Sequence, residues 1–157
     1  MKRITGTTLL AFVLGSLLAV AQPARADDLK ACSNHAVAGK WSYRIAGSLL
    51  SDPNNEIYSN DFPVAAVGTF TLDRSGKVSG GGPYKSGCCV SQITFSGSYT
   101  VNGDCVGEVS FELFQDGDDI GPFTLEQVFG NNANDVHWIT TDPYHVLNID
   151  GQRLFHD

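Results

Sequence analysis

Turn-forming residues recur along the chain after residue 40, and this spacing limits the fold more than any other feature. Gly, Asn, Asp and Pro return about every eight to twelve residues, which leaves no room for a long segment with helical periodicity. Between these turns, apolar and polar side chains alternate, most clearly over residues 93–101, as in a half-buried strand. Asn102-Gly103 then predicts a two-residue type I′ turn, and residues 109–113 predict the returning strand of a hairpin.

The same alternation predicts about eight strands joined by short turns. We expect them at residues 41–45, 64–72, 77–79, 93–101, 109–113, 123–129 and 136–141, with two short pieces at 144–148 and 152–155. Short connections without crossover helices favour a meander, which removes its exposed edges by closing on itself. The sequence therefore predicts an all-β fold, a small antiparallel up-and-down barrel. A two-sheet β-sandwich is the alternative, because the sequence does not show whether the first strand pairs with the last. Residues 48–60 are expected to form a long solvated loop or to lie over the open end.

The first 26 residues have the organisation of a secretory signal peptide. Met1-Lys2-Arg3 is a short basic head, residues 9–21 are apolar but too short to span a bilayer, and Ala24-Arg25-Ala26 is a cleavage signal. Residues 27–157 are then expected to form a single β-barrel domain. We expect this domain to be secreted or periplasmic in a bacterium.

The predicted mature domain is acidic. Without Lys2, Arg3 and Arg25, seven basic residues remain against seventeen acidic ones, a formal net charge of 7 − 17 = −10. Nucleic acid and anionic lipid are therefore poor partners, because both require a basic surface. No later apolar run is long enough to form a membrane helix, so no membrane span is predicted.

All four cysteines, Cys32, Cys88, Cys89 and Cys105, follow the predicted signal peptide. In an oxidising compartment they allow up to two disulfides with three possible connectivities. Cys88 and Cys89 are adjacent, so in a strand they would point to opposite faces. No Cys-x-x-Cys spacing accompanies them, so no metal site is predicted.

Two sets of residues resemble known barrels. Gly39-Lys40-Trp41 and Arg153 resemble the signature of the calycins, in which an Arg from the end of the barrel packs over the indole at the closed base. Cys32 with the strand that follows it, residues 65–73 leading into 76–80, and residues 97–107 are similar to a group of small secreted bacterial proteins with a barrel like that of allene oxide cyclase. This second resemblance implies a fold group that includes cyclases and dirigent-type proteins, which bind apolar substrates.

The position of Cys32 and Cys105 in the resembling group implies a disulfide between them. Cys88 and Cys89 would then be free, bonded to each other, or linked to another chain. In the competing arrangement, one member of the adjacent pair is bonded to Cys32 and the other to Cys105.

No strong catalytic motif is present, and no cofactor is predicted. His35, His137, His145 and His156 lack the spacing of a local zinc pair, and His137 is expected on a strand surface. Asp116-Gly117-Asp118-Asp119 offers three carboxylates for calcium but lacks the rest of an EF-hand loop, so a solvated hairpin tip is favoured. Glu126 is expected to be exposed; in the lumen it would be a candidate general acid or base.

Eight aromatic residues fall on the apolar parity of their strands, and in a closed barrel they would converge in the interior. They are Trp41, Tyr43, Phe70, Phe95, Tyr99, Phe111, Phe123 and Trp138. They either fill the barrel or line a cavity for a small apolar or aromatic ligand. The favoured hypothesis is a ligand-binding barrel. The alternatives are a cyclase- or isomerase-type enzyme and an extracellular protein whose loops bind or inhibit another protein. The sequence does not predict an oligomeric state.

Overall fold

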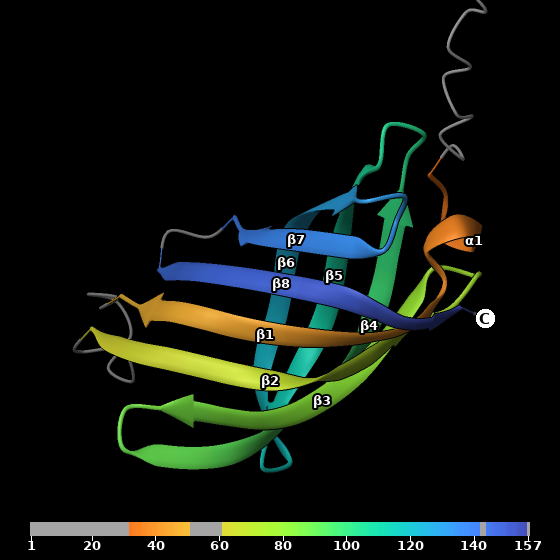
Figure 1. Ribbon diagram of the computed structural model, residues 1–157. Coiled ribbons are helices and arrows are strands. Elements are labelled where there is room, and N and C mark those ends of the chain that lie inside the picture. Colours follow the sequence, from red (N-terminus) through yellow and green to blue (C-terminus); the bar gives the residue numbers. More distant parts are fainter. Residues whose placement is uncertain (1–31, 51–60, 142–143, 157) are drawn as a thin grey trace, which may run out of the picture.

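The computed structural model describes residues 32–50, 61–141 and 144–156. Its strands form one closed antiparallel barrel in which each strand pairs with its neighbours in sequence (Figure 1). The predicted all-β up-and-down barrel is therefore confirmed. The predicted signal peptide, residues 1–26, and most of the predicted loop at 48–60 lie outside the described residues. The strands are β1 (Gly39–Leu49), β2 (Phe62–Leu72), β3 (Lys77–Ser86), β4 (Cys89–Val101), β5 (Val106–Gln115), β6 (Asp118–Gly130), β7 (Asp135–Thr140) and β8 (His145–His156).

The pairing of β1 with β8 closes the barrel and excludes the two-sheet sandwich. In this pair Tyr43 lies opposite Gly151, and Ile45 lies opposite Ile149. The register shifts between Lys40 and Trp41, where a β-bulge interrupts the ladder. First and last strands are hydrogen-bonded to each other, so no strand of the barrel has a free edge.

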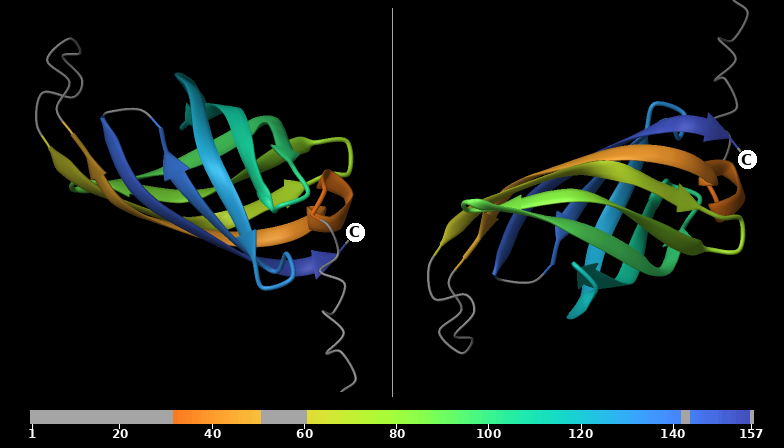
Figure 2. Two further views of the ribbon diagram at one scale, coloured as in Figure 1. Left: turned by 90° about the horizontal axis from the view of Figure 1, so that it is seen from above. Right: turned by 90° about the horizontal axis from the view of Figure 1, so that it is seen from below.

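The two ends of the barrel differ. At one end lies the only helix of the described residues, α1 (Asn34–Val37), beside the C-terminal end of β8 (Figure 2). The Ser33 hydroxyl caps this helix by accepting a hydrogen bond from Ala36 N at 3.2 Å. Val37 is completely buried, so α1 covers this end, which we call the base. The opposite end carries the β3–β4 and β5–β6 turns, and we call it the mouth.

The β4–β5 turn is not the predicted two-residue type I′ turn. Neither Asn102 nor Gly103 has a positive φ; the residue in the left-handed region is Cys105, with φ 68°. Cys105 N donates to Asn102 O at 3.1 Å, and Val106 N donates to Asn102 Oδ1 at 2.9 Å. The connection is therefore a β-turn followed by one left-handed residue, a common three-residue hairpin loop. Its left-handed residue is a cysteine because that position carries a disulfide to Cys32.

Most strands are longer than predicted, and in two of them the prediction stopped at a glycine that lies inside the strand. The predicted strand at 77–79 continues to Ser86 through three successive glycines, and the two pieces predicted at 144–155 form one strand through Gly151. These glycines lie within strands because neighbouring atoms leave no room for a Cβ: side chains lie against Gly80 and Gly151, and strand backbone lies against Gly81 and Gly82. A Cβ on Gly151 would lie 3.0 Å from the Trp138 ring, so this glycine gives the ring its place against the wall.

Candidate functional site

A cavity of about 840 Å³ occupies the barrel between its centre and the mouth. Every strand contributes side chains to its lining, because residues on one parity of each strand point inward. Most of these side chains are aliphatic or aromatic. The polar exceptions are Tyr43 and Tyr84 in the wall and, toward the mouth, Ser86, Gln115, Asp116, Asp118, Asp119, Thr140 and His145.

Six of the eight predicted aromatic residues line this cavity, and we call them the aromatic wall. They are Tyr43, Phe70, Phe95, Phe111, Phe123 and Trp138. Their rings touch in series: ring centroids are 5.9 Å apart for Tyr43 and Phe95, 5.2 Å for Phe95 and Phe111, and 6.1 Å for Phe111 and Phe123. Phe70 extends the series, because its ring lies 6.3 Å from that of Tyr43 and packs edge-on against Trp138 at 5.1 Å. The rings therefore form a continuous apolar surface around a space that they do not fill.

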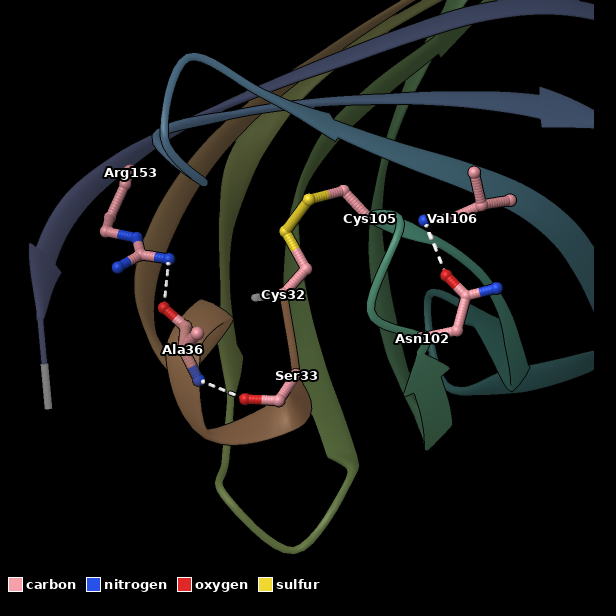
Figure 3. Close-up of a disulfide and its surroundings, with 7 residues drawn as sticks. All are labelled: Cys32, Ser33, Ala36, Asn102, Cys105, Val106 and Arg153. Atoms are coloured by element: carbon pink, nitrogen blue, oxygen red, sulfur yellow. Dashed lines mark hydrogen bonds between the residues drawn. A yellow bond between two sulfur atoms is a disulfide. The ribbon is translucent and has the colours of Figure 1, made fainter. Parts of the chain in front are cut away.

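The other two predicted residues, Trp41 and Tyr99, lie at the base and do not line the cavity. Trp41 is fully buried, and its indole N–H donates to Val37 O at 3.1 Å. The Arg153 guanidinium carbon lies 4.8 Å from the centroid of the Trp41 ring. Arg153 also donates to Ala36 O at 2.8 Å, which ties the end of β8 to α1 (Figure 3). These contacts hold the helix over the base.

Tyr99 joins three segments at the base. Its hydroxyl oxygen lies 2.6 Å from Asp73 O and 3.1 Å from Asn34 O. Asn34 in turn accepts a hydrogen bond from Val101 N at 2.9 Å. The phenol of Tyr99 is therefore engaged in structure and offers nothing to a ligand.

Glycines behind the rings make room for the aromatic wall. A Cβ on Gly68 would lie 2.7 Å from the Tyr43 hydroxyl oxygen, and a Cβ on Gly80 would lie 2.6 Å from both Phe70 and Phe95. Both glycines are on the inward parity of β2 and β3. Larger residues there would push the rings into the lumen, so the glycines preserve the cavity.

The Tyr43 hydroxyl is the polar group in the wall that lacks a partner. Tyr43 is 6% exposed, and its hydroxyl oxygen makes no hydrogen bond within the described part of the chain. Burial raises the pKa of Tyr43 to about 12, so the phenol stays protonated at physiological pH. Tyr43 therefore presents a neutral, buried hydroxyl that is available to a ligand oxygen or nitrogen.

Gln127 is a buried polar residue that was not predicted. It is 1% exposed, and its Nε2 donates to Thr100 O at 3.0 Å. Its Oε1 accepts from the Trp138 indole N–H at 3.0 Å, so that donor is not available to a ligand. The sequence does contain a signal, because Gln127 alternates in phase with Leu125 and Phe129. In the structure it lies opposite Gly107, which has no side chain to occupy the space.

The β5–β6 turn brings three carboxylates to the mouth. Asp116, Asp118 and Asp119 are exposed, as expected for a hairpin tip, and they also line the cavity entrance. Asp116 Oδ1 accepts from Gln92 N, and Asp119 Oδ1 accepts from Gly121 N, both at 2.8 Å. The His145 ring lies 5.2 Å from the Phe123 ring on the same rim.

The remaining candidates lie outside the cavity. Glu126 is exposed on the outer face, as predicted. His137 is also on the outer face, and its Nδ1 lies 2.8 Å from Asp150, which also pairs with Arg44. Within the residues that the structure describes, no group of three or more His, Cys, Asp or Glu is placed to hold a metal ion.

The structure contains a disulfide between Cys32 and Cys105, which joins the segment before α1 to the β4–β5 turn (Figure 3). This rules out the arrangement in which each is bonded to one member of the adjacent pair. Cys88 and Cys89 are exposed free thiols at the mouth, with their sulfurs 2.8 Å apart. The hydrogen bond from Cys88 and the charge on it raise the pKa of Cys89.

Comparisons of the chain with protein-family models, curated proteins and solved structures find no match. Across the described ranges, no helix has the length and apolar character needed to cross a membrane.

Proposed function

We propose that the protein binds a small apolar or aromatic molecule inside the barrel. The observation that carries this proposal is the unfilled space of about 840 Å³ enclosed by the aromatic wall. Ligand sites in proteins are typically cavities of about 300–1,000 Å³ with mostly apolar linings and a few polar groups. The barrel matches this description, and Tyr43 supplies a polar group at a defined position.

Affinity would come mainly from burial of the ligand. A ligand that buries about 300 Å² of apolar surface gains roughly 7 kcal/mol at 25 cal/mol per Å², before the cost of immobilisation. This gain alone corresponds to a dissociation constant of about 10 μM, and the cost of immobilisation weakens it, so a dissociation constant of tens of micromolar or higher is expected. The uncharged aromatic wall predicts weak dependence on salt for a neutral ligand.

The test is a titration with the neutral apolar fluorophore N-phenyl-1-naphthylamine. We expect its emission to increase and to saturate on binding. Leu113→Trp fills part of the cavity and should abolish the signal, whereas Val67→Trp adds the same indole to the outer face, where Val67 is 57% exposed. If both variants fold and both bind like the parent protein, the probe is not in the barrel. If the parent protein binds no apolar probe, the proposal fails in favour of loop-mediated binding to another protein.

A second candidate is a cyclase- or isomerase-type enzyme, and the Tyr43 hydroxyl is the observation that favours it. A neutral donor in an apolar chamber can polarise a substrate oxygen but is a poor base, because its pKa is about 12. A lipophilic bacterial extract incubated with the protein and analysed by mass spectrometry distinguishes the two candidates. A binding protein returns its ligand unchanged. An enzyme yields a product that the Tyr43→Phe variant does not form.

We also propose that the protein is secreted or periplasmic and that its barrel is of the allene-oxide-cyclase-like or calycin-like kind. The Cys32–Cys105 disulfide supports the compartment, since such bonds persist in oxidising environments. The packing of Arg153 over Trp41 at the base supports the kinship, because it is the arrangement that the resemblance implies.

A further inference from the structure

We infer that the cavity selects amphiphiles with a positively charged end. The cationic group would lie at the mouth beside Asp116, Asp118 and Asp119, and the apolar body would lie against the aromatic wall. This inference rests on the proposed function and specifies the class of ligand.

The charges of the lining carry the argument. Among the described residues that line the cavity, the carboxylates are those of the β5–β6 turn, and no Lys or Arg is present. Arg44 and Arg153 do not balance these carboxylates: Arg44 pairs with Asp150 on the outer face, and Arg153 covers Trp41 at the base. On entry, an anionic amphiphile such as a fatty acid would therefore meet three carboxylates and no Lys or Arg of the lining, whereas an ammonium group would be attracted.

The three carboxylates are accessible to a cation. Asp116 and Asp119 each use one oxygen to bind a backbone N–H, which orients the carboxylate. Their second oxygens and the Asp118 carboxylate make no hydrogen bond within the described ranges. Three oriented or free carboxylates within one turn lie within a Debye length, about 8–10 Å, of the same bound ion.

The Tyr43 hydroxyl is the second, independent observation. Tyr43 is more than nine-tenths buried, lines the same cavity, and has an unpartnered hydroxyl. It is a neutral donor, so it favours a ligand with a hydrogen-bond acceptor in its body and adds no positive charge that would attract an anion. The two polar features thus act on different parts of one ligand. Tyr43 favours a hydrogen-bond acceptor in the part that lies inside the barrel, and the carboxylates favour a cationic group at the mouth.

The experiment compares three probes with the same ten-carbon chain: decyltrimethylammonium, 1-decanol and decanoate. Each displaces N-phenyl-1-naphthylamine from the protein at pH 7.5, in 20 mM and in 500 mM NaCl. At low salt we expect the ammonium probe to bind about tenfold more tightly than the alcohol, and decanoate to bind about tenfold more weakly. Both differences should shrink at 500 mM NaCl, because salt screens exposed charges.

The variant D116N/D118N/D119N tests the location of the effect. Asparagine keeps the Oδ1 acceptor at positions 116 and 119 and tolerates the φ of 53° at Asp116. We expect the preference for the ammonium probe to disappear while the affinity for decanol is retained. The matched control E108Q/E112Q/E126Q removes the same charge from the exposed outer face of β5 and β6 and should keep the preference.

Each outcome decides a different point. Equal affinities for the three probes in the parent protein would overturn the inference and leave the proposed function intact. Equal loss of preference in both triple variants would show a general effect of net charge and would also overturn it. Failure of every probe to bind would overturn the proposed function itself. If the triple variant does not fold, Asp118→Asn alone, which breaks no hydrogen bond, should reduce the preference about two- to threefold; an unchanged preference refutes the site.

Discussion

Replacing Tyr43 by Phe should stabilise the empty barrel and weaken ligand binding. The substitution keeps the ring, which packs against Phe70 and Phe95, and removes only the unpartnered hydroxyl. A buried hydroxyl without a hydrogen bond costs about 1–3 kcal/mol. Since an open cavity admits water, which meets part of that need, we expect the lower end, an increase of about 1 kcal/mol in the free energy of unfolding.

The same variant should show a changed dependence on pH. The unfolded chain loses the Tyr43 proton near pH 10, whereas the folded protein keeps it until about pH 12. The unfolded state therefore binds fewer protons in this window, so the stability of the parent protein falls as pH rises through it. The Phe variant lacks this contribution, and the difference in stability between the two proteins should widen above pH 10.

Urea unfolding followed by circular dichroism measures both effects. For binding, 2-decanone, which has an oxygen acceptor, should lose about two- to tenfold in affinity, whereas decane should lose nothing. The reasoning is refuted if Tyr43→Phe destabilises the protein by 1 kcal/mol or more, because the hydroxyl would then have a partner that the structure does not show. It is also refuted if the ketone and the hydrocarbon respond alike.

Three further predictions concern the frame of the barrel. The disulfide between Cys32 and Cys105 closes a loop with a sequence separation of 73, so its reduction should lower the free energy of unfolding by roughly 4 kcal/mol. An unchanged melting curve after complete reduction, verified by mass, would contradict this. Arg153→Met removes a cation–π contact and a hydrogen bond at the base and should lower the free energy of unfolding in urea by about 1–3 kcal/mol. The control Arg44→Met, which breaks an exposed ion pair, should cost less than about 1 kcal/mol. Equal costs would mean that the contacts at the base stabilise the protein no more than an exposed ion pair does. The pKa of Asp150 is lowered by its hydrogen bond to a histidine and then by its arginine partner, so its contribution is present above about pH 4 and lost as pH falls through the lower folded value. Asp150→Asn should remove this acid-dependent loss, less than about 1 kcal/mol, from the unfolding profile, and an unaltered profile would show that the pair contributes nothing.

The barrel could be predicted because apolar and polar residues alternate along each strand, and this period of two shows which face of the strand is buried. That pattern identified the strands and put the aromatic rings inside. It could not identify the β4–β5 turn, because Asn-Gly is also compatible with a longer loop, and the bridge at Cys105 determines which loop forms. Nor could it show that β8 is continuous, since a glycine under a tryptophan ring looks like a glycine in a turn.

The site was harder to predict than the fold. Parity predicts that a ring points inward, but not at what height, so Trp41 and Tyr99 could not be distinguished from the residues nearer the mouth. Whether rings meet or leave a space depends on barrel diameter and on the glycines behind them, which only the register reveals. The carboxylates of the β5–β6 turn were recognised as a solvated tip, but their place at the cavity entrance required the three-dimensional course of the strands.

The pairing of the first strand with the last has a consequence for how the molecule assembles. The Ser42 hydroxyl of β1 donates a hydrogen bond to the backbone oxygen of Gln152 in β8, 110 residues later. The barrel therefore cannot close until nearly the whole chain is available. Contacts between such distant residues slow folding, because the ends of a long loop must meet before any stabilisation is gained. Cys32 and Cys105, by contrast, both precede β8 in the sequence, so both are synthesised before it. Oxidation of this pair would fasten α1 to the central hairpin while the barrel is still open, and β8 would then complete a scaffold whose base is already covalently assembled.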